Sequence, residues 1–146
     1  MAEQITNQPH QPVTVLVVDD DQNILKSLTM LLEDEGYRVL QAPDGEVALD
    51  ILSACPAPLI VLTDHHMPVL DGAGLLRRVL EKPTLVSGHA YVYMTAGRSH
   101  LSPDVHQVLA TLDAPVLFKP FGVDQVLDAI KTAAHYLLSA EQTEAS

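Results

Sequence analysis

The chain has 146 residues but only one cysteine, Cys55, so no disulfide can form within it. A lone cysteine is typical of proteins from reducing compartments, and we expect a cytoplasmic protein. No apolar run approaches the roughly 20 residues that a membrane-spanning helix requires. The first residues of the chain are polar and lack the apolar stretch of a signal peptide, so we expect neither secretion nor membrane insertion.

Basic residues are also scarce. The chain has 8 lysines and arginines against 19 aspartates and glutamates, which gives a formal net charge of −11. Nucleic acids and anionic membrane surfaces both attract basic side chains, so we expect no nucleic acid and no membrane as a partner. With 47% hydrophobic residues and no internal repeat, the sequence predicts one globular domain.

Short apolar runs that favour β-structure alternate with segments of helical periodicity. The predicted strands cover residues 13–18, 37–41, 59–63, 90–95 and 115–118, and the predicted helices cover 21–35, 44–54, 71–80, 102–110 and 122–138. Strands that each precede a helix predict a parallel sheet with right-handed crossovers, and therefore an α/β fold. We expect residues 13–138 to form the domain, with a disordered tail over 1–12 and a polar, frayed tail over 139–146.

Charged residues follow three of the predicted strands. Asp19, Asp20 and Asp21 follow the first strand, Asp64 follows the third, and Lys119 follows the fifth. Since the carboxyl ends of parallel strands meet at one edge of the sheet, where ligands of open α/β sheets bind, we expect these side chains to lie together. A nest of carboxylates beside one ammonium suits a divalent cation and a phosphoryl group that bridges to it.

Simpler interpretations of these residues are also open. An acidic cluster can be a solvated turn, and Asp21 can serve only as the N-cap of the following helix. His65 and His66 could bind zinc together with Cys55. Adjacent side chains point in different directions, however, and no further ligand lies at a familiar spacing, so we disfavour a zinc site. A flavin phosphate would be repelled by the aspartates that follow the first strand.

Several short motifs occur in a fixed order along the chain, most of them at the ends of predicted strands. Together they resemble the receiver domain of two-component response regulators, over residues 13–138. The resemblance implies a three-layer, doubly wound sheet of five parallel strands in the flavodoxin-like order 2-1-3-4-5. The matching residues are Leu16-Val17-Val18-Asp19-Asp20-Asp21, Gly45, Ala48-Leu49, Asp64-His65-His66-Met67-Pro68, Asp71-Gly72, Met94-Thr95-Ala96 and Lys119-Pro120-Phe121.

The resemblance and the chemistry of the residues agree on a metal site. Asp19 and Asp20 would hold Mg²⁺, one directly and one through water, because this ion keeps several waters and takes one or two carboxylates together with phosphate oxygens. Asp64 would share the ion, and the resemblance adds the main-chain carbonyl of His66 as a further ligand. We therefore predict Mg²⁺ as the cofactor.

Asp64 is also the predicted nucleophile, which would become an aspartyl phosphate. Lys119 would place its positive charge beside the phosphoryl oxygens, and Thr95 would donate its hydroxyl to one of them. We do not expect an enzyme for external substrates, because the chain would catalyse only its own phosphorylation and dephosphorylation. A phosphatase of external substrates usually carries a second acid two residues after the nucleophile, where this chain has His66.

These roles imply a phosphoacceptor domain in a phosphorelay. It would take its phosphoryl group from a sensor histidine kinase or a phosphotransfer protein and would signal through a downstream protein partner. We expect a monomer or a weak homodimer. The alternative is a receiver-fold module that binds partners without being phosphorylated, and the complete set of acids, threonine and lysine disfavours it.

One position departs from the receiver pattern. Many receivers carry an aromatic residue three positions before the lysine, and its ring moves together with the threonine hydroxyl; here that position is Val116. Phe118 is expected on the other side of the sheet, where it would not replace the missing ring. Tyr91 and Tyr93, two residues apart in one strand, are expected to share one face and to pack in the core.

Overall fold

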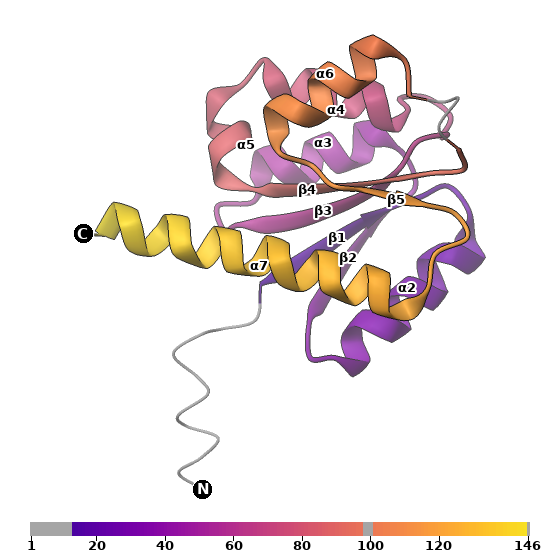
Figure 1. Cartoon of the computed structure of the whole chain (residues 1–146), viewed down its shortest axis with the longest axis horizontal. Helices are drawn as coiled ribbons and strands as arrows, with labels where there is room; N and C mark the ends of the chain where they lie inside the picture. Colours follow the sequence, from indigo (N-terminus) through magenta and orange to yellow (C-terminus); the bar gives the residue numbers. More distant parts are fainter. Residues whose placement is uncertain (1–12, 98–100, 146) are drawn as a thin grey trace, which may run out of the picture.

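A computed structural model describes residues 13–97 and 101–145, with side chains described up to residue 139. Its centre is a five-stranded sheet in which every pair of neighbouring strands runs parallel (Figure 1). The strand order is β2-β1-β3-β4-β5, so the predicted flavodoxin-like order is confirmed. The strands are β1 (Thr14–Val18), β2 (Arg38–Ala42), β3 (Leu59–Asp64), β4 (Ala90–Thr95) and β5 (Val116–Phe118).

Helices cover both faces of the sheet, which gives the three predicted layers. They are α2 (Gln22–Asp34), α3 (Gly45–Ala54), α4 (Gly72–Leu80), α5 (Pro83–Gly88), α6 (Pro103–Leu112) and α7 (Val123–Ala145). Helices α2 and α7 cover one face, and α3 to α6 cover the other (Figure 1). Within the described residues, no helix has the length and apolar character needed to span a bilayer.

Alternating side chains of the strands fill two separate cores. In β1, Val15 and Val17 pack on the side of α2 and α7, whereas Leu16 and Val18 pack on the side of the other helices. All four side chains are buried because both faces of the sheet are covered, which explains the continuous apolar run in the sequence. The central strands are therefore packed on both faces and fix the positions from which the loops at their carboxyl ends begin.

Three helices begin directly after a residue whose side chain caps the first turn. The side chain of Asp21 accepts hydrogen bonds from the main-chain N–H groups of Asn23 and Ile24 at the start of α2. Asp44 and Ser102 cap α3 and α6 in the same way. These contacts satisfy N–H groups that have no partner within the helix. The interpretation of Asp21 as an N-cap is thus confirmed.

Two helices differ from the prediction. The sequence pattern predicts that Pro83 ends the third helix, but in the structure this residue begins α5, a short helix that the pattern does not predict. Proline is favoured in the first turn of a helix, where its missing N–H needs no partner. Helix α7 runs to Ala145, past the expected end at residue 138, because the polar residues there are mostly good helix formers. The tail expected over residues 1–12 lies outside the described residues.

The expectation for Phe118 is wrong. Val116 and Phe118 both pack on the side of α3 to α6, and Leu117 between them packs on the opposite side. Side chains two positions apart in a strand point to the same face, so the valine and the phenylalanine must share it. The same rule holds for Tyr91 and Tyr93, and their predicted burial on one face is confirmed.

Candidate functional site

The carboxyl ends of four strands bring the predicted site residues to one edge of the sheet. Asp19 and Asp20 follow β1, Asp64 is the last residue of β3, Thr95 is the last residue of β4, and Lys119 follows β5. Carboxylate oxygens from the three aspartates all lie within 4.8 Å of one another. The fold therefore joins acidic residues and a lysine that are far apart in the sequence.

Lys119 reaches into the acidic cluster. Its Nζ atom donates a hydrogen bond of 2.7 Å to Asp64 Oδ1 and lies 3.7 Å from Asp19 Oδ2. Its main-chain N–H donates to the carbonyl of Thr95 at 2.8 Å, which ties the ends of β4 and β5 together. Partial burial opposes the charge of the ammonium, but the carboxylates of Asp64 and Asp19 outweigh burial and raise the pKa of Lys119.

Asp19 occupies a position that is unfavourable for a carboxylate. It is 1% exposed; its Oδ1 accepts the N–H of Asp21 at 2.9 Å, and its Oδ2 is buried with no hydrogen-bond partner among the described residues. Burial raises the pKa of Asp19 to about 6 despite the hydrogen bond from Asp21, and the charge of Asp64 adds to the rise. A buried carboxylate oxygen without a hydrogen bond, beside further carboxylates, belongs to a ligand set that a hard divalent cation prefers, so these residues fit Mg²⁺.

The remaining predicted residues lie at the same edge with different exposures. Thr95 is fully buried, and its hydroxyl donates to the carbonyl of Gly97 at 3.5 Å. The side chain of His66 is exposed, and a role for its carbonyl as a metal ligand stays a prediction.

The structure also decides on the alternative of a zinc site. Cys55 directly follows α3 near the start of β3, whereas His65 and His66 follow the end of β3. The cysteine is therefore at the opposite edge of the sheet and cannot complete a zinc site with the histidines.

Two glycines let the loop between β3 and α4 pack closely. The N–H of Gly45 donates to the carbonyl of Leu70, and the N–H of Gly72 donates to that of His65, both at 2.9 Å. A Cβ atom at Gly72 would lie 2.2 Å from the main-chain oxygen of Asp64, and one at Gly45 would lie 2.6 Å from that of Leu70. Both distances exclude any larger residue without a shift of the main chain, which explains these glycines in the motifs.

Sequence reasoning missed one contact at the site. It predicts only a packing role for Tyr93, but in the structure the Tyr93 hydroxyl forms a hydrogen bond with Nδ1 of His65, next to Asp64. Tyr91, by contrast, donates its hydroxyl to the carbonyl of Leu85 at 2.8 Å. Strand periodicity predicts the face of Tyr93, but its partner lies 28 positions away and no local signal points to it.

The chain is similar to known proteins over most of its length. The family model of the response regulator receiver domain matches residues 15–131. Sporulation initiation phosphotransferase F of Bacillus subtilis is 33% identical over 118 residues, which cover 80% of this chain and 90% of that protein. The response regulator MprA of Mycolicibacterium vanbaalenii is 37% identical over 123 residues, which cover 80% of this chain. They cover only 48% of MprA, so the chain spans about half the length of that relative.

Solved structures share the fold. The chemotaxis protein CheY4 of Vibrio cholerae superposes with a TM-score of 0.70 at 26% identity, over 84% of this chain and 98% of that chain. A CheY-like receiver domain protein of Methanospirillum hungatei JF-1 gives a TM-score of 0.69 at 26% identity, over 88% and 97% of the two chains. Because the family match, the strand order and the structural neighbours agree, the chain belongs to the response regulator receiver domains of two-component systems.

Proposed function

We propose that Asp64 is the phosphoacceptor of this domain and that a phosphohistidine supplies the phosphoryl group. A carboxylate oxygen of Asp64 attacks the phosphorus, and a P–O bond forms while the P–N bond to the donor imidazole breaks. The imidazole leaves with the electron pair of that bond. The observation that carries the proposal is the 2.7 Å hydrogen bond from Lys119 Nζ to Asp64 Oδ1, beside the carboxylates of Asp19 and Asp20.

Each residue of the cluster has a task in this step. Lys119 directs its charge at the oxygens of the incoming phosphoryl group. Thr95, buried at the end of β4, donates its hydroxyl to one of these oxygens once Asp64 carries them. The three aspartates, with the carbonyl of His66, would hold Mg²⁺. When bound there, Mg²⁺ offsets the repulsion between the carboxylates and the phosphoryl oxygens.

The competing proposal is a module that binds partners without being phosphorylated. The environment of Asp19 favours the phosphoacceptor, because a carboxylate whose pKa is raised to about 6 destabilises the folded chain at neutral pH. A neutral side chain would serve a pure binding module better at this buried position. The unfavourable charge has a use only if a cation or a phosphoryl group is handled at the site.

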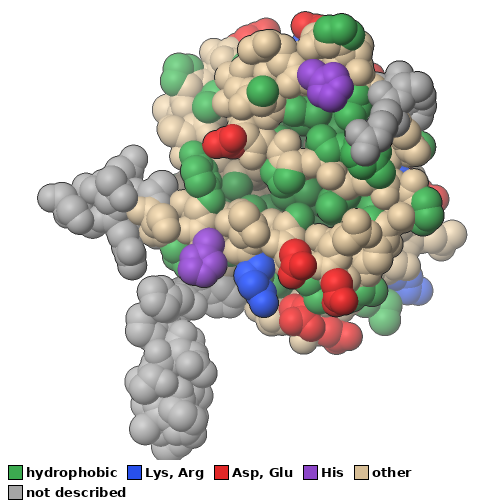
Figure 2. Space-filling view, in the orientation of Figure 1, with side chains coloured by type: hydrophobic (Ala, Val, Ile, Leu, Met, Phe, Trp, Pro, Cys, Tyr) green, Lys and Arg blue, Asp and Glu red, His purple; other side chains and the backbone are tan. Residues whose placement is uncertain are grey.

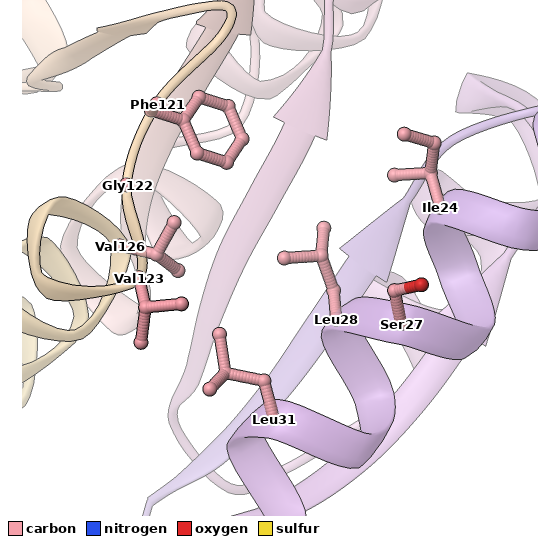
Figure 3. A pocket seen from close by; sticks show the side chains of 8 residues that line it. All are labelled: Ile24, Ser27, Leu28, Leu31, Phe121, Gly122, Val123 and Val126. Carbon is pink, nitrogen blue, oxygen red and sulfur yellow. The ribbon is translucent and has the colours of Figure 1, made fainter.

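The phosphoryl donor is proposed to dock on an apolar groove between α2 and the start of α7. The groove has a volume of about 300 Å³, and side chains from the two elements face one another across it (Figure 3). Val123 is apolar yet 55% exposed, and Phe121 follows Lys119 by two residues, so the groove adjoins the site. A helix that carries the donor histidine can rest its apolar side here. The groove is lined by Ile24, Ser27, Leu28, Leu31, Phe121, Gly122, Val123 and Val126.

The signal is proposed to leave through a protein partner bound to the face of α6, β5 and α7, with the domain acting as a monomer or weak homodimer. Figure 2 shows hydrophobic side chains gathered between α6 and α7 on this face. A groove of about 210 Å³ lies there, and Leu112, Pro115 and Tyr136 contribute to its lining. Thr95 ends β4 and Lys119 directly follows β5, and these two neighbouring strands at one edge of the sheet connect the site to this face.

Incubation with acetyl phosphate and Mg²⁺ tests the assignment of Asp64. The wild type should gain one phosphoryl group, about 80 Da by intact mass, and Asp64→Asn should gain none. Asp34→Asn is the matched control, because it removes an exposed carboxylate at the far end of α2, and it should be labelled like the wild type. Undiminished labelling of Asp64→Asn would refute the assignment. An unlabelled wild type would favour the unphosphorylated binding module.

A further inference from the structure

Tyr93 lies on the face of β4 beneath the loop that joins β3 to α4. Its side chain is 0% exposed, and its hydroxyl forms a hydrogen bond with Nδ1 of His65. The two rings meet edge to face, with centroids 5.6 Å apart and an angle of 72° between their planes. A buried tyrosine hydroxyl usually has a polar partner, and here that partner directly follows Asp64 in the chain.

His65 is anchored on two sides. Its carbonyl oxygen accepts the N–H of Gly72 at 2.9 Å, and its ring meets the hydroxyl of Tyr93. The ring of Tyr93 also closes the space beneath Gly72, since a Cβ atom on that glycine would lie 3.1 Å from Tyr93 Cε1. The turn that leads from Asp64 to α4 is therefore held by both a main-chain and a side-chain contact.

The Tyr93 hydroxyl also lies within the electrostatic field of the site. Burial raises the pKa of Tyr93, and the carboxylates of Asp71 and Asp64 raise it further, while Arg77 opposes them. The phenol therefore keeps its proton at physiological pH. Replacing it by phenylalanine would leave the ring in the core but remove its hydrogen bond to the side chain of His65.

We propose that Tyr93 is a positioning residue for the phosphorylation of Asp64. Through its hydrogen bond it orients His65, and this fixes the turn that carries the acceptor carboxylate and the carbonyl of His66. In-line transfer depends on such placement. An acceptor that is already held in the reactive geometry loses less conformational entropy on reaching the transition state. The inference rests on the proposed function of Asp64. It assigns a positioning role in that reaction to Tyr93, a residue of the core.

Tyr91 is a matched control for Tyr93. It lies two residues earlier on the same face of β4, is 2% exposed, and donates its hydroxyl to the carbonyl of Leu85 at 2.8 Å. Tyr91→Phe and Tyr93→Phe thus each remove one buried hydroxyl and one hydrogen bond from the same core. Both variants should lower the melting temperature by similar amounts, but only Tyr93→Phe should slow phosphorylation.

The experiment measures the rate of phosphorylation by acetyl phosphate at saturating Mg²⁺, followed by intact mass because the chain has no tryptophan for fluorescence. Tyr93→Phe should lower the limiting rate constant of phosphorylation about fivefold, the scale of one hydrogen bond, with the half-saturating concentration of acetyl phosphate unchanged. Tyr91→Phe should react like the wild type. Equal rates for the two variants would overturn the inference and leave Asp64 as the acceptor. An unphosphorylated wild type would overturn both proposals.

A double-mutant cycle tests the route through His65. His65→Leu removes the same hydrogen bond from the loop side, so it also tests the inference if Tyr93→Phe does not fold. In the His65→Leu background, Tyr93→Phe should cause no further loss of rate, because the contact is already absent. Additive losses would overturn the positioning role. The imidazole NMR signals of His65 should shift in Tyr93→Phe and not in Tyr91→Phe, and unchanged signals would count equally against it.

Discussion

Replacing Asp19 by asparagine should make the metal-free protein more stable. Its pKa rises from 3.8 to about 6, so at about 1.4 kcal/mol per unit the charged form costs the folded state about 3 kcal/mol at neutral pH. Asparagine removes this charge and keeps an oxygen that can accept the N–H of Asp21, now 2.9 Å from Oδ1. It loses the attraction of Lys119, whose Nζ lies 3.7 Å from Oδ2. We expect a net gain of about 1–2 kcal/mol.

Thermal unfolding in EDTA measures this gain. For a domain of this size, it should raise the melting temperature by about 3–6 °C. Mg²⁺ should stabilise the wild type by mass action and leave Asp19→Asn nearly unchanged, so the difference between the two proteins should narrow or reverse when the ion is added. Asp20→Asn is the matched control, because this carboxylate is exposed: it should lose the response to Mg²⁺ but gain less stability in EDTA.

The dependence on pH has a definite sign. Between pH 3.8 and about 6, folded wild type holds a proton on Asp19 that the unfolded chain has released. The stability of the wild type therefore falls as the pH rises through this window and stays lower above it. The advantage of Asp19→Asn should grow from about pH 4 to about pH 6 and then level off. The stability advantage of Asp19→Asn could instead be absent near neutral pH, or equal at about pH 4 and about pH 6. Either result would show that burial of the charged Asp19 does not destabilise the folded state.

Two further changes test other parts of the fold. Burial lowers the pKa of His89, whose Nδ1 accepts the N–H of Leu59 at 2.9 Å, so its stabilising contribution should be lost as the pH falls below 6.5. The test is made in the Asp19→Asn background, because Asp19 would otherwise titrate in an overlapping pH range. The melting temperatures of Asp19→Asn with and without His89→Gln should converge as the pH falls; a constant difference would contradict this. Gly72→Ala should cost about 2–3 kcal/mol in denaturant unfolding, because its Cβ atom would lie 2.2 Å from a main-chain oxygen. Gly88→Ala, where a Cβ atom meets nothing within 4 Å, should cost far less; equal losses would refute the steric reason.

The strand-end residues of the site could be predicted from the sequence, because two rules are enough: short apolar runs predict strands, and parallel strands end at one edge of the sheet. Asp19, Asp64 and Lys119 each end or follow a short apolar run, and parallel strands bring such ends to one edge. Helix boundaries were less predictable, because one residue type can serve two purposes. Pro83 is as suitable for the first turn of α5 as for the end of α4, and only the surrounding packing decides between them.

The contact of Tyr93 with His65 could not be predicted in this way. Strand periodicity assigns a side chain to a face of the sheet, and it does so correctly for Tyr93. It gives no information about which loop lies above that face, because this depends on how α4 begins and on the absence of a side chain at Gly72. Tyr91 and Tyr93 have the same position in the strand pattern, yet one hydroxyl meets a helix carbonyl and the other meets the site.

The unfavourable position of Asp19 also relates the stability of the fold to the proposed function. The carboxylate follows the buried residues of β1 directly, so the main chain cannot move it towards water without disturbing the sheet. Complete burial of one valine or leucine contributes about 1.5–3 kcal/mol, which is comparable to the cost of the charged Asp19. The apolar strands β1 and β3 thus supply the stability that keeps the acidic residues together before any cation is bound. The proposed site for a cation and a phosphoryl group depends on this arrangement, because carboxylates free to separate would first have to be brought together by the ligand.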